Sequence, residues 1–426
     1  MVMKRLFQFP EMTYVKQPLF HSNIQDLSGV ISSAFEPISH LRPARARETV
    51  AIAVGSRNID NLDGVVRQTI RFLDEKGFKP FIVPAMGSHG GATPEGQKKV
   101  LERLSISEAA MNVPIVADMT TKCVGELPSG FNIFVSAPAF SADHIVLINR
   151  VKRHTKFRAD IESGLCKMMT IGLGKQKGAS EFHRFAVGHT FTVIEESARF
   201  LLSKLKIIFG VALIEDGYGK LAHIEILMPE NLISREKELL KDAARMAPRI
   251  PFDNLDILIV DQIGKDISGI GMDSNVTGRH RDIVGNIYEW PHAKRIFVRD
   301  LSPASDGNAN GIGLADVTTN RLVQKIDRRK TFVNAITAIS PEKAAIPIHF
   351  ETDRQGLDAC MKTTGVNDPK SLRVVRIKNT AQLEYVQVSH PFEIEFGLVP
   401  GLKQITPWAP VEFDPSDNMT ELNIHE

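Results

Sequence analysis

Short apolar runs alternate with amphipathic segments along most of the chain. In the first half, runs with the length and composition of buried strands occur at 49–54, 80–84, 144–149 and 207–214. Segments with helical periodicity lie at 63–76, 94–104 and 192–205, and the second of these opens with a Thr93-Pro94 start signal. The alternation is typical of βαβ units and predicts an α/β fold with mostly parallel sheets.

The pattern restarts near residue 250. A predicted helix at 236–246 is followed by Ala247-Pro-Arg-Ile-Pro251, a stiff break. Beyond it we expect strands at 256–260, 295–298 and 373–377, a helix from about Leu314 and another at 356–363. A length of 426 residues also exceeds what one core usually supports. We predict two Rossmann-like domains, 1–250 and 251–426, with the active-site cleft between them; whether the tail from Asn379 packs back on the first domain stays open.

Composition and charge narrow the classes of partner that we expect for this protein. A net charge of +2 favours neither nucleic acid nor an anionic membrane as a partner. The three cysteines are far apart and form no CxxC pair, which fits a reducing compartment. The first ten residues are a poor signal peptide, and no apolar stretch is long enough to span a membrane. We therefore expect a cytoplasmic protein that acts on a small molecule.

Three predicted strands end in loops that carry candidate chemistry. Arg57 follows the first strand, His89 lies in the glycine-rich Ser88-His-Gly90-Gly91, and His154 lies in a basic loop after the third. Ligands bind at this edge of open α/β sheets. Glycine-rich loops expose N–H groups to phosphates, and arginine suits carboxylates or phosphates. Each residue also has an ordinary interpretation: a surface salt bridge for Arg57, a turn histidine for His89, a solvated basic loop for His154.

Lys167 and His183 form the most informative pair. Lys167 stands in Gly164-Leu-Cys-Lys167-Met-Met-Thr-Ile-Gly172, whose apolar residues can desolvate an amine enough for covalent attachment. His183 follows sixteen residues later and can bring an imidazole to a metal. Both could instead be surface residues, and His189 is a rival for the metal role. The chain lacks the GxGxxG, GxxxxGK[ST] and HExxH motifs, which weakens the common nucleotide and zinc-protease assignments.

Taken in order, these segments resemble the nickel-pincer-dependent lactate racemase family, within a superfamily of 2-hydroxy-acid racemases and epimerases. The resemblance covers about 45–190 and is carried by four segments: Ala51-Ile-Ala-Val-Gly-Ser-Arg57, Ala85-Met-Gly-Ser-His89-Gly-Gly-Ala-Thr-Pro-Glu95, Asp143 to His154, and Gly164-Leu-Cys-Lys167 through His183.

The resemblance implies a cofactor and a set of roles. The cofactor is a nickel-bearing pyridinium mononucleotide with a thioamide and a thiocarboxylic acid arm, made by separate enzymes. Lys167 would carry it covalently, and His183 would be the protein's nickel ligand. His89 and His154 would be the acid/base pair in reversible hydride transfer from a 2-hydroxy acid. Arg57, Ser88, Gly90 and Gly91 would contact the cofactor or the substrate carboxylate.

Departures from the family pattern argue against lactate as the substrate. Val54 stands where the family commonly has an aspartate, and Gly164-Leu-Cys-Lys167 replaces Gly-Gly-x-Lys. The family's Tyr-Gln-x-x-Lys-like group is not reproduced by 264–273. We therefore expect a larger or more polar hydroxy acid. Its candidate pocket residues are Lys265, Asn275, Arg279 and Asn310.

Two other functions stay open at this stage. One is an NAD(P)-dependent oxidoreductase, although the missing glycine fingerprint counts against it. The other is a non-catalytic protein that binds nickel or a phosphorylated ligand. The oligomeric state, the physiological direction and the identity of the hydroxy acid are not predicted.

Overall fold

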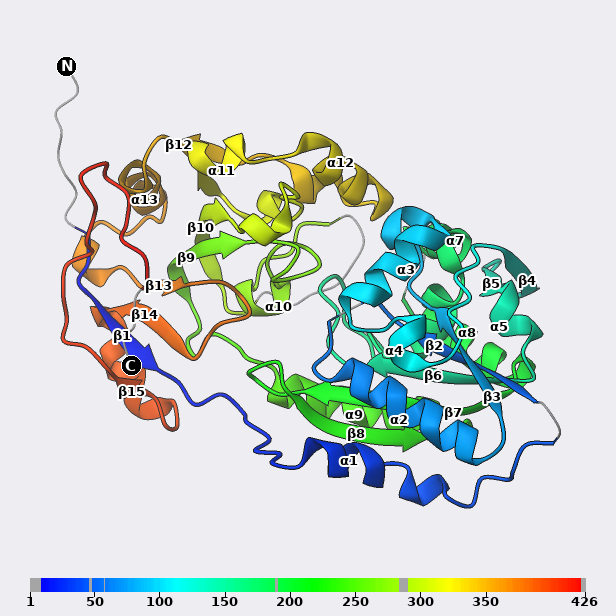
Figure 1. The fold of residues 1–426 in the computed structure, drawn as a ribbon. Helices are drawn as coiled ribbons and strands as arrows, with labels where there is room; N and C mark the ends of the chain where they lie inside the picture. The colour runs from blue at the N-terminus through cyan, green and yellow to red at the C-terminus, as the bar shows by residue number, and fades with distance from the viewer. Residues whose placement is uncertain (1–8, 46–47, 57, 188–190, 283–289, 423–426) are drawn as a thin grey trace. The chain divides into compact units, whose positions relative to one another are not determined.

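The computed structural model describes residues 9–45, 48–56, 58–187, 191–282 and 290–422. It divides into two compact units, one made of 20–247 and the other of 1–19 with 248–426 (Figure 1). The chain passes between the two units after Leu19 and after Ala247, so residues 1–19 share a unit with 248–426 and not with the rest of the predicted domain 1–250. The described tail after Asn379 also belongs to the C-terminal unit.

The unit of residues 20–247 is built on a five-stranded sheet in the order β3-β2-β6-β7-β8. The first four strands are parallel, and β8 pairs antiparallel with β7. The strands are β2 (Thr49–Val54), β3 (Lys79–Pro84), β6 (His144–Arg150), β7 (Ile207–Glu215) and β8 (Leu221–Leu227), beside a separate hairpin of β4 (Thr121–Glu126) and β5 (Asn132–Ser136). The four predicted strands are present; β8 and the hairpin were not predicted.

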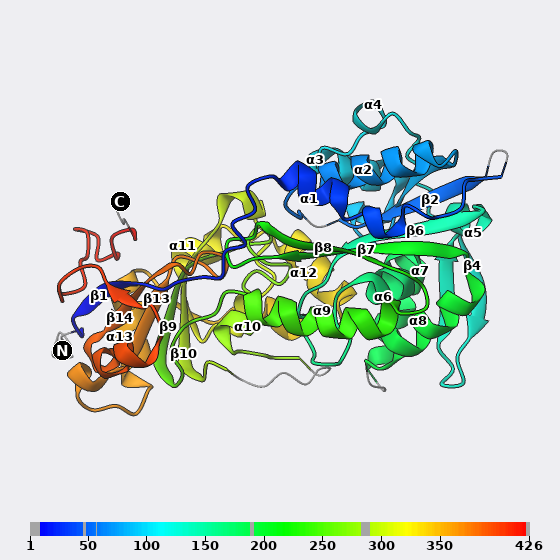
Figure 2. The same cartoon turned by 90° about the horizontal axis from the view of Figure 1, so that it is seen from below.

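Helices cover both faces of this sheet (Figure 2). One face carries α1 (Leu27–Ser33), α2 (Leu62–Glu75), α3 (Pro94–Arg103) and α4 (Glu108–Met111). The other carries α6 (Leu165–Lys167), α8 (Val193–Lys204) and α9 (Leu232–Met246), and this unit also contains α5 (Ala137–Ser141), a π-helical turn η3 (Met168–Gly172) and α7 (Lys175–Ala186).

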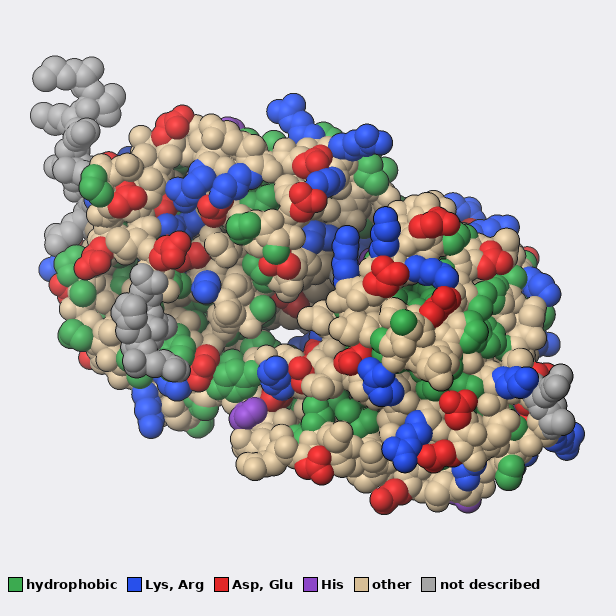
Figure 3. Space-filling model, in the orientation of Figure 1, with side chains coloured by type: hydrophobic (Ala, Val, Ile, Leu, Met, Phe, Trp, Pro, Cys, Tyr) green, Lys and Arg blue, Asp and Glu red, His purple; other side chains and the backbone are tan. Residues whose placement is uncertain are grey.

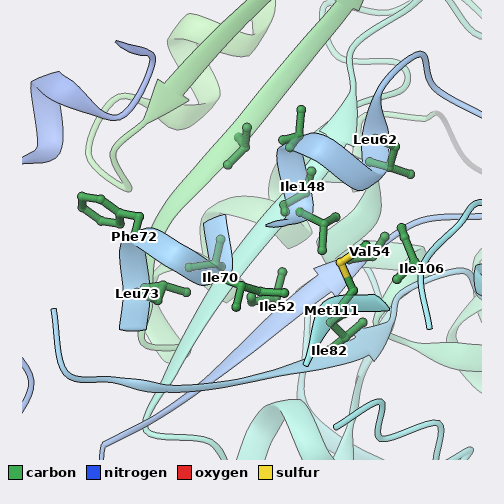
Figure 4. Packing of buried hydrophobic residues seen from close by; sticks show 14 of the residues in the cluster. Ile52, Val54, Leu62, Ile70, Phe72, Leu73, Ile82, Ile106, Met111 and Ile148 are labelled. Carbon is green, nitrogen blue, oxygen red and sulfur yellow. The ribbon is translucent and has the colours of Figure 1, made fainter. Parts of the chain in front are cut away.

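Alternation along β2 explains the three layers. Val50, Ile52 and Val54 are buried in the same cluster as Ile70 and Leu73 of α2, and Figure 4 shows this packing from close by. The intervening residues of β2 are also buried, because the second helical layer covers the opposite face. This explains why the strand reads as a continuous apolar run and not as an alternating one.

The C-terminal unit contains an eight-stranded sheet in the order β12-β11-β10-β9-β13-β14-β1-β15. It is parallel from β12 to β13 and antiparallel from β13 to β15. Its strands are β1 (Met12–Lys16), β9 (Leu255–Ile263), β10 (Ala293–Leu301), β11 (Val317–Thr319), β12 (Ile348–Phe350), β13 (Val374–Ile377), β14 (Tyr385–Ser389) and β15 (Lys403–Gln404). Its α-helices are α10 (Ser274–Thr277), α11 (Asn320–Gln324), α12 (Arg328–Thr337) and α13 (Asp353–Lys362).

One predicted helix in this unit is wrong. The segment from about Leu314 forms a short 3-10 turn, then β11, and only then α11. Thr318 and Thr319 are β-branched and buried, and their hydroxyls donate to carbonyls of β10. Strand pairing therefore overrides the local periodicity.

Buried ion pairs fix the end of the chain in this unit. Arg299 and Arg376 are both paired with Asp261, and Arg299 also pairs with Asp353. The two guanidinium groups donate to the carbonyls of Met419 and Thr420. The tail is thus attached through charged residues of four elements, β9, β10, β13 and α13.

The surface is of mixed character. Lys, Arg, Asp and Glu side chains are interspersed with hydrophobic ones on the face shown in Figure 3. Among the described helices, none is both long and apolar enough to cross a membrane.

Candidate active site

The candidate residues of the first unit leave one edge of its sheet. β3, β2 and β6 are adjacent and parallel, so the loops after Pro84, Val54 and Arg150 begin side by side. The chain runs from β2 to β3 on one side and to β6 on the other, so the topology switches direction at β2, where α/β sheets bind ligands. His89 and His154 lie in the two outer loops. Arg57 follows the middle strand but lies outside the described residues.

Glycine geometry shapes the His89 loop. Gly87, Gly90 and Gly91 all have positive φ, which an L side chain rarely adopts. Gly90 also packs so closely that an added Cβ would lie 2.5 Å from the carbonyl carbon of Gly96. His89 is exposed, and its Nδ1 lies 2.7 Å from the carbonyl oxygen of Met86. The loop presents an imidazole to solvent on a tightly packed backbone.

The buried side chain of Lys175 stabilises the His89 loop. Lys175 is fully buried, and its ammonium donates to the carbonyl of Pro84 (2.6 Å) and to Oε1 of Gln97 (2.9 Å). Gln97 in turn donates to the carbonyls of Gly87 (3.0 Å) and His89 (3.4 Å). Burial lowers the pKa of Lys175 from 10.5 to about 8, opposed by the charge of Asp118. In sequence Lys175 is one of two lysines shortly after Gly174, so only its burial reveals its role.

The His154 loop is held by a carboxylate instead. Glu162 is buried and accepts the backbone N–H of His154 (2.5 Å), while Arg158 lies 3.6 Å away. Burial raises the pKa of Glu162, and these partners oppose the rise. Nδ1 of His154 accepts the backbone N–H of Lys156 (3.2 Å). The two ends of the His154 loop are joined where Lys152 and Ser163 form an antiparallel β-bridge.

Both loops contact the segment that carries Lys167. Nζ of Lys167, which is half-buried, donates to Oγ of Ser163 (3.4 Å) at the end of the His154 loop. On the other side, the N–H of Gly87 donates to the carbonyl of Gly172 (3.1 Å). Between them the chain passes through the π-helical turn η3, a feature frequent at functional sites.

Glu236 fixes the start of that segment. Its carboxylate accepts the N–H groups of Leu165 (2.7 Å) and Cys166 (3.1 Å). The residue is buried, its other oxygen has no hydrogen-bond partner among the described residues, and burial raises its pKa from 4.5 to about 7. The acid comes from α9, about seventy residues further along the chain. Helical periodicity gives no sign of this contact, so sequence reasoning missed it.

An aromatic ladder leads from His154 towards His183. The His154 ring lies against Phe157 (centroids 4.4 Å apart), and Phe157 stacks on Phe191 (3.9 Å). Phe191 contacts Phe182 (6.1 Å), the residue before the half-buried His183 in the last turn of α7. His189, the rival metal ligand, lies outside the described residues. Within those residues, no group of three or more His, Cys, Asp or Glu side chains is arranged to hold a metal ion.

The four substrate candidates belong to the C-terminal unit. Lys265 follows β9, and its ammonium donates to the carbonyl of Gly269 (2.5 Å) and to Oδ1 of Asn334 (2.6 Å). The other three candidates differ in how they are held. Asn275 donates to Asp273 (2.7 Å), Arg279 pairs with Asp316 (2.9 Å), and Asn310 is buried with Oδ1 unpartnered among the described residues.

Part of the chain matches a known domain family, and its fold resembles two solved structures. Residues 12–192 match the model of the lactate racemase N-terminal domain, a stretch that holds His89, His154, Lys167 and His183. The chain resembles the lactate racemase apoprotein from Thermoanaerobacterium thermosaccharolyticum at 14% identity and a TM-score of 0.53, over 87% of this chain and 99% of that one. It also resembles a structural-genomics protein from Thermotoga maritima at 16% identity and a TM-score of 0.51, over 77% and 84%. No curated protein matches the sequence.

Fold and comparisons together define a mixed α/β protein built like a lactate racemase. The predicted resemblance to the lactate racemase family is confirmed over residues 12–192, which match the lactate racemase N-terminal domain, and the fold resembles that of a lactate racemase.

Proposed function

We propose that this protein is a racemase or epimerase of a 2-hydroxy acid other than lactate, acting by reversible hydride transfer to a nickel-pincer nucleotide attached to Lys167. The observation that carries the proposal is the convergence of the His89 and His154 loops on the Lys167 segment, at one sheet edge inside the matched domain. Both loops that carry a candidate acid/base histidine thus contact the segment of the half-buried Lys167, which supports the proposal.

The residues present fit such a cofactor. Gly55, at the end of β2, adds no side chain beside Met168, the neighbour of Lys167: a Cβ there would lie 3.4 Å from Cε of Met168. A nickel ion held mainly by cofactor atoms needs few protein ligands, so His183 suffices and no cluster of protein ligands is required. When bound, the cofactor would supply the hydride acceptor, which no protein side chain can provide.

The protein's own groups would handle binding and protons. His89 and His154 would exchange the substrate hydroxyl proton, and Arg57 would bind cofactor phosphate or substrate carboxylate. Ser88, Gly90 and Gly91 would border the cofactor.

Contacts in the C-terminal unit bear on which substrate candidate binds. Among the described residues, Oδ1 of Asn310 has no hydrogen-bond donor, which suits a substrate hydroxyl, whereas the guanidinium of Arg279 is already paired with Asp316. This ranks Asn310 above Arg279 as a pocket residue.

The test is intact mass, nickel content and loss of optical purity, on protein co-expressed with the cofactor-synthesis enzymes. We expect a covalent adduct and bound nickel in the wild type and in Lys177→Met, an exposed lysine on α7, but no adduct in Lys167→Met. Unmodified wild-type protein without nickel would contradict the proposal. A nicotinamide-linked absorbance change with hydroxy acids would favour an oxidoreductase instead, and nickel binding without racemisation would favour a binding protein.

A further inference from the structure

Two buried polar side chains join the His89 loop to the segment that carries Lys167. Gln97 lies on α3, Lys175 is the first residue of α7, and both are fully buried. In the chain, Lys175 stands eight residues after Lys167 and eight before His183. The pair therefore connects the His89 loop to the stretch between the two residues assigned to the cofactor.

The hydrogen bonds of the pair fix the orientation of the Gln97 amide. An ammonium group can only donate, so the atom of Gln97 that lies 2.9 Å from Nζ of Lys175 is Oε1. Nε2 then faces two carbonyl oxygens, those of Gly87 (3.0 Å) and His89 (3.4 Å), which can only accept. A flipped amide would place like groups against each other at both ends, so each end of Gln97 has one function.

The backbone of Lys175 shows that this position depends on the side chain. Its φ is 54°, in the left-handed region that side chains other than glycine rarely adopt. A glycine would adopt this conformation without strain, as would suit the turn after Gly174. The buried ammonium also donates to the carbonyl of Pro84 (2.6 Å), where the His89 loop begins. The contacts of the ammonium with the loop and with Gln97 offset the backbone strain.

Backbone packing joins the same loop and segment at a second point. The N–H of Gly87 donates to the carbonyl of Gly172 (3.1 Å), and a Cβ on Gly172 would lie 2.5 Å from the carbonyl oxygen of Ala85. Gly87 is thus held through its N–H by Gly172 and through its carbonyl by Gln97. The backbone is fixed on the chain side of His89 and at the carbonyl of His89 itself, while His89 remains exposed.

We propose that Gln97 and Lys175 are positioning residues for the reaction. They hold the His89 loop at a fixed distance from the segment of Lys167, and they act through backbone carbonyls and not on the substrate. Proton transfer needs hydrogen-bond reach between base and substrate, and a displacement of about 1 Å can cost about 10²-fold in rate. This inference rests on the proposed function for the role of His89, and it keeps both histidines in the roles given above.

The change Gln97→Glu separates the two ends of this link. The new carboxylate still accepts from Lys175, but it has no N–H to donate to the two loop carbonyls. With a hydroxy acid that the loaded wild type racemises, we expect kcat to fall about 10- to 100-fold, while the adduct on Lys167, the bound nickel and KM stay within about threefold. Gln176→Glu makes the same charge change at an exposed position of α7 and should keep full activity.

The link can also be measured without cofactor or substrate. In the full-length apoprotein, hydrogen–deuterium exchange of residues 85–92 should be about tenfold faster in Gln97→Glu than in the wild type or in Gln176→Glu, with exchange in α2 unchanged. If Gln97→Glu does not fold, Gln97→Met, which introduces no buried charge, replaces it in both measurements. A loop that exchanges as in the wild type, or exchange that rises equally in α2, would overturn the inference.

A double substitution tests whether the two residues act as one link. Gln97→Met and Lys175→Met each break it, so the double variant should lose no more activity than the larger single loss, within about threefold, whereas independent roles would multiply the losses. A racemising wild type whose kcat is unaffected by Gln97→Glu would overturn the inference and leave the proposed function standing. A wild type that racemises no hydroxy acid would overturn the proposed function, and the exchange experiment would still decide whether Gln97 fixes the loop.

Discussion

The loops that carry His89 and His154 leave the same sheet edge and are stabilised in opposite ways. The His89 loop is short and glycine-rich, and the cation of Lys175 holds it through carbonyl oxygens. The His154 loop is longer, and the anion of Glu162 holds it through backbone N–H groups. In each case the buried charge binds the backbone and not the imidazole.

The two loops also place different backbone groups next to the imidazole rings. The tight turn after β3 directs a carbonyl at Nδ1 of His89, whereas the open loop after β6 directs an N–H at Nδ1 of His154. The two histidines therefore face backbone groups of opposite kind at Nδ1, a difference that comes from the loops that carry them.

The sharpest test of the tight loop replaces its two adjacent glycines. Gly90 and Gly91 have nearly equal φ values of 67° and 66°, but only Gly90 has a backbone neighbour within 3 Å of an added Cβ. Gly91→Ala should cost only the left-handed strain, about 1–2 kcal/mol. Gly90→Ala should cost at least about 4 kcal/mol, because the backbone must also move. Urea unfolding measures both, and equal losses would show that the loop is not closely packed at Gly90.

Removing the buried cation should have the next largest effect. Lys175→Met leaves the carbonyl of Pro84 and Oε1 of Gln97 without a donor, which should cost about 2–4 kcal/mol at pH 7. Lys177→Met on the same helix is the exposed control and should cost less than about 1 kcal/mol.

The pH dependence of the stability difference between the wild type and Lys175→Met tests whether Lys175 is buried as a charged group. The folded pKa of Lys175 is about 8, below its usual 10.5, so between these values the unfolded chain binds the extra proton. The wild type should therefore gain stability relative to Lys175→Met as pH rises from about 8 to about 10.5, by roughly 3 kcal/mol. A difference that stays constant with pH would mean that Lys175 keeps its ordinary pKa in the folded state and pays no cost for burial.

Glu236, which holds the start of the Lys167 segment, should make stability depend on pH in the opposite sense. The pKa of Glu236 is raised from 4.5 to about 7, so the folded state binds the extra proton between these values. Compared with Glu236→Gln, the wild type should lose roughly 2–3 kcal/mol of stability as pH rises from about 4.5 to 7. Chemical denaturation across this range checks it, with Glu238→Gln on the same helix as the exposed control. A stability difference that rises with pH would contradict the assigned burial cost.

The sequence predicted those features that depend on neighbouring residues. The strands at 49–54, 80–84 and 144–149, and hence the loops of His89 and His154, follow from apolar runs and turn residues. β1 was not predicted because its partners lie near the other end of the chain, with Met12 opposite Ser389. Lys175, Glu162 and Glu236 were missed for a related reason: a buried charge has the same letter as an exposed one, and only its partners distinguish the two.

The smallest effect on stability is expected at Glu162, where two variants separate the contribution of its charge from that of its hydrogen bond to the His154 loop. Glu162→Ala leaves the backbone N–H of His154 without its acceptor and should cost about 1–3 kcal/mol. Glu162→Gln keeps a carbonyl oxygen for the N–H of His154 and removes the charge whose burial raises the pKa of Glu162, so the stability of this variant should stay within about 1 kcal/mol of the wild type. Urea unfolding at pH 7 compares the two. If glutamine cost as much as alanine, the loop would depend on the negative charge near Arg158 and not on the hydrogen bond to His154.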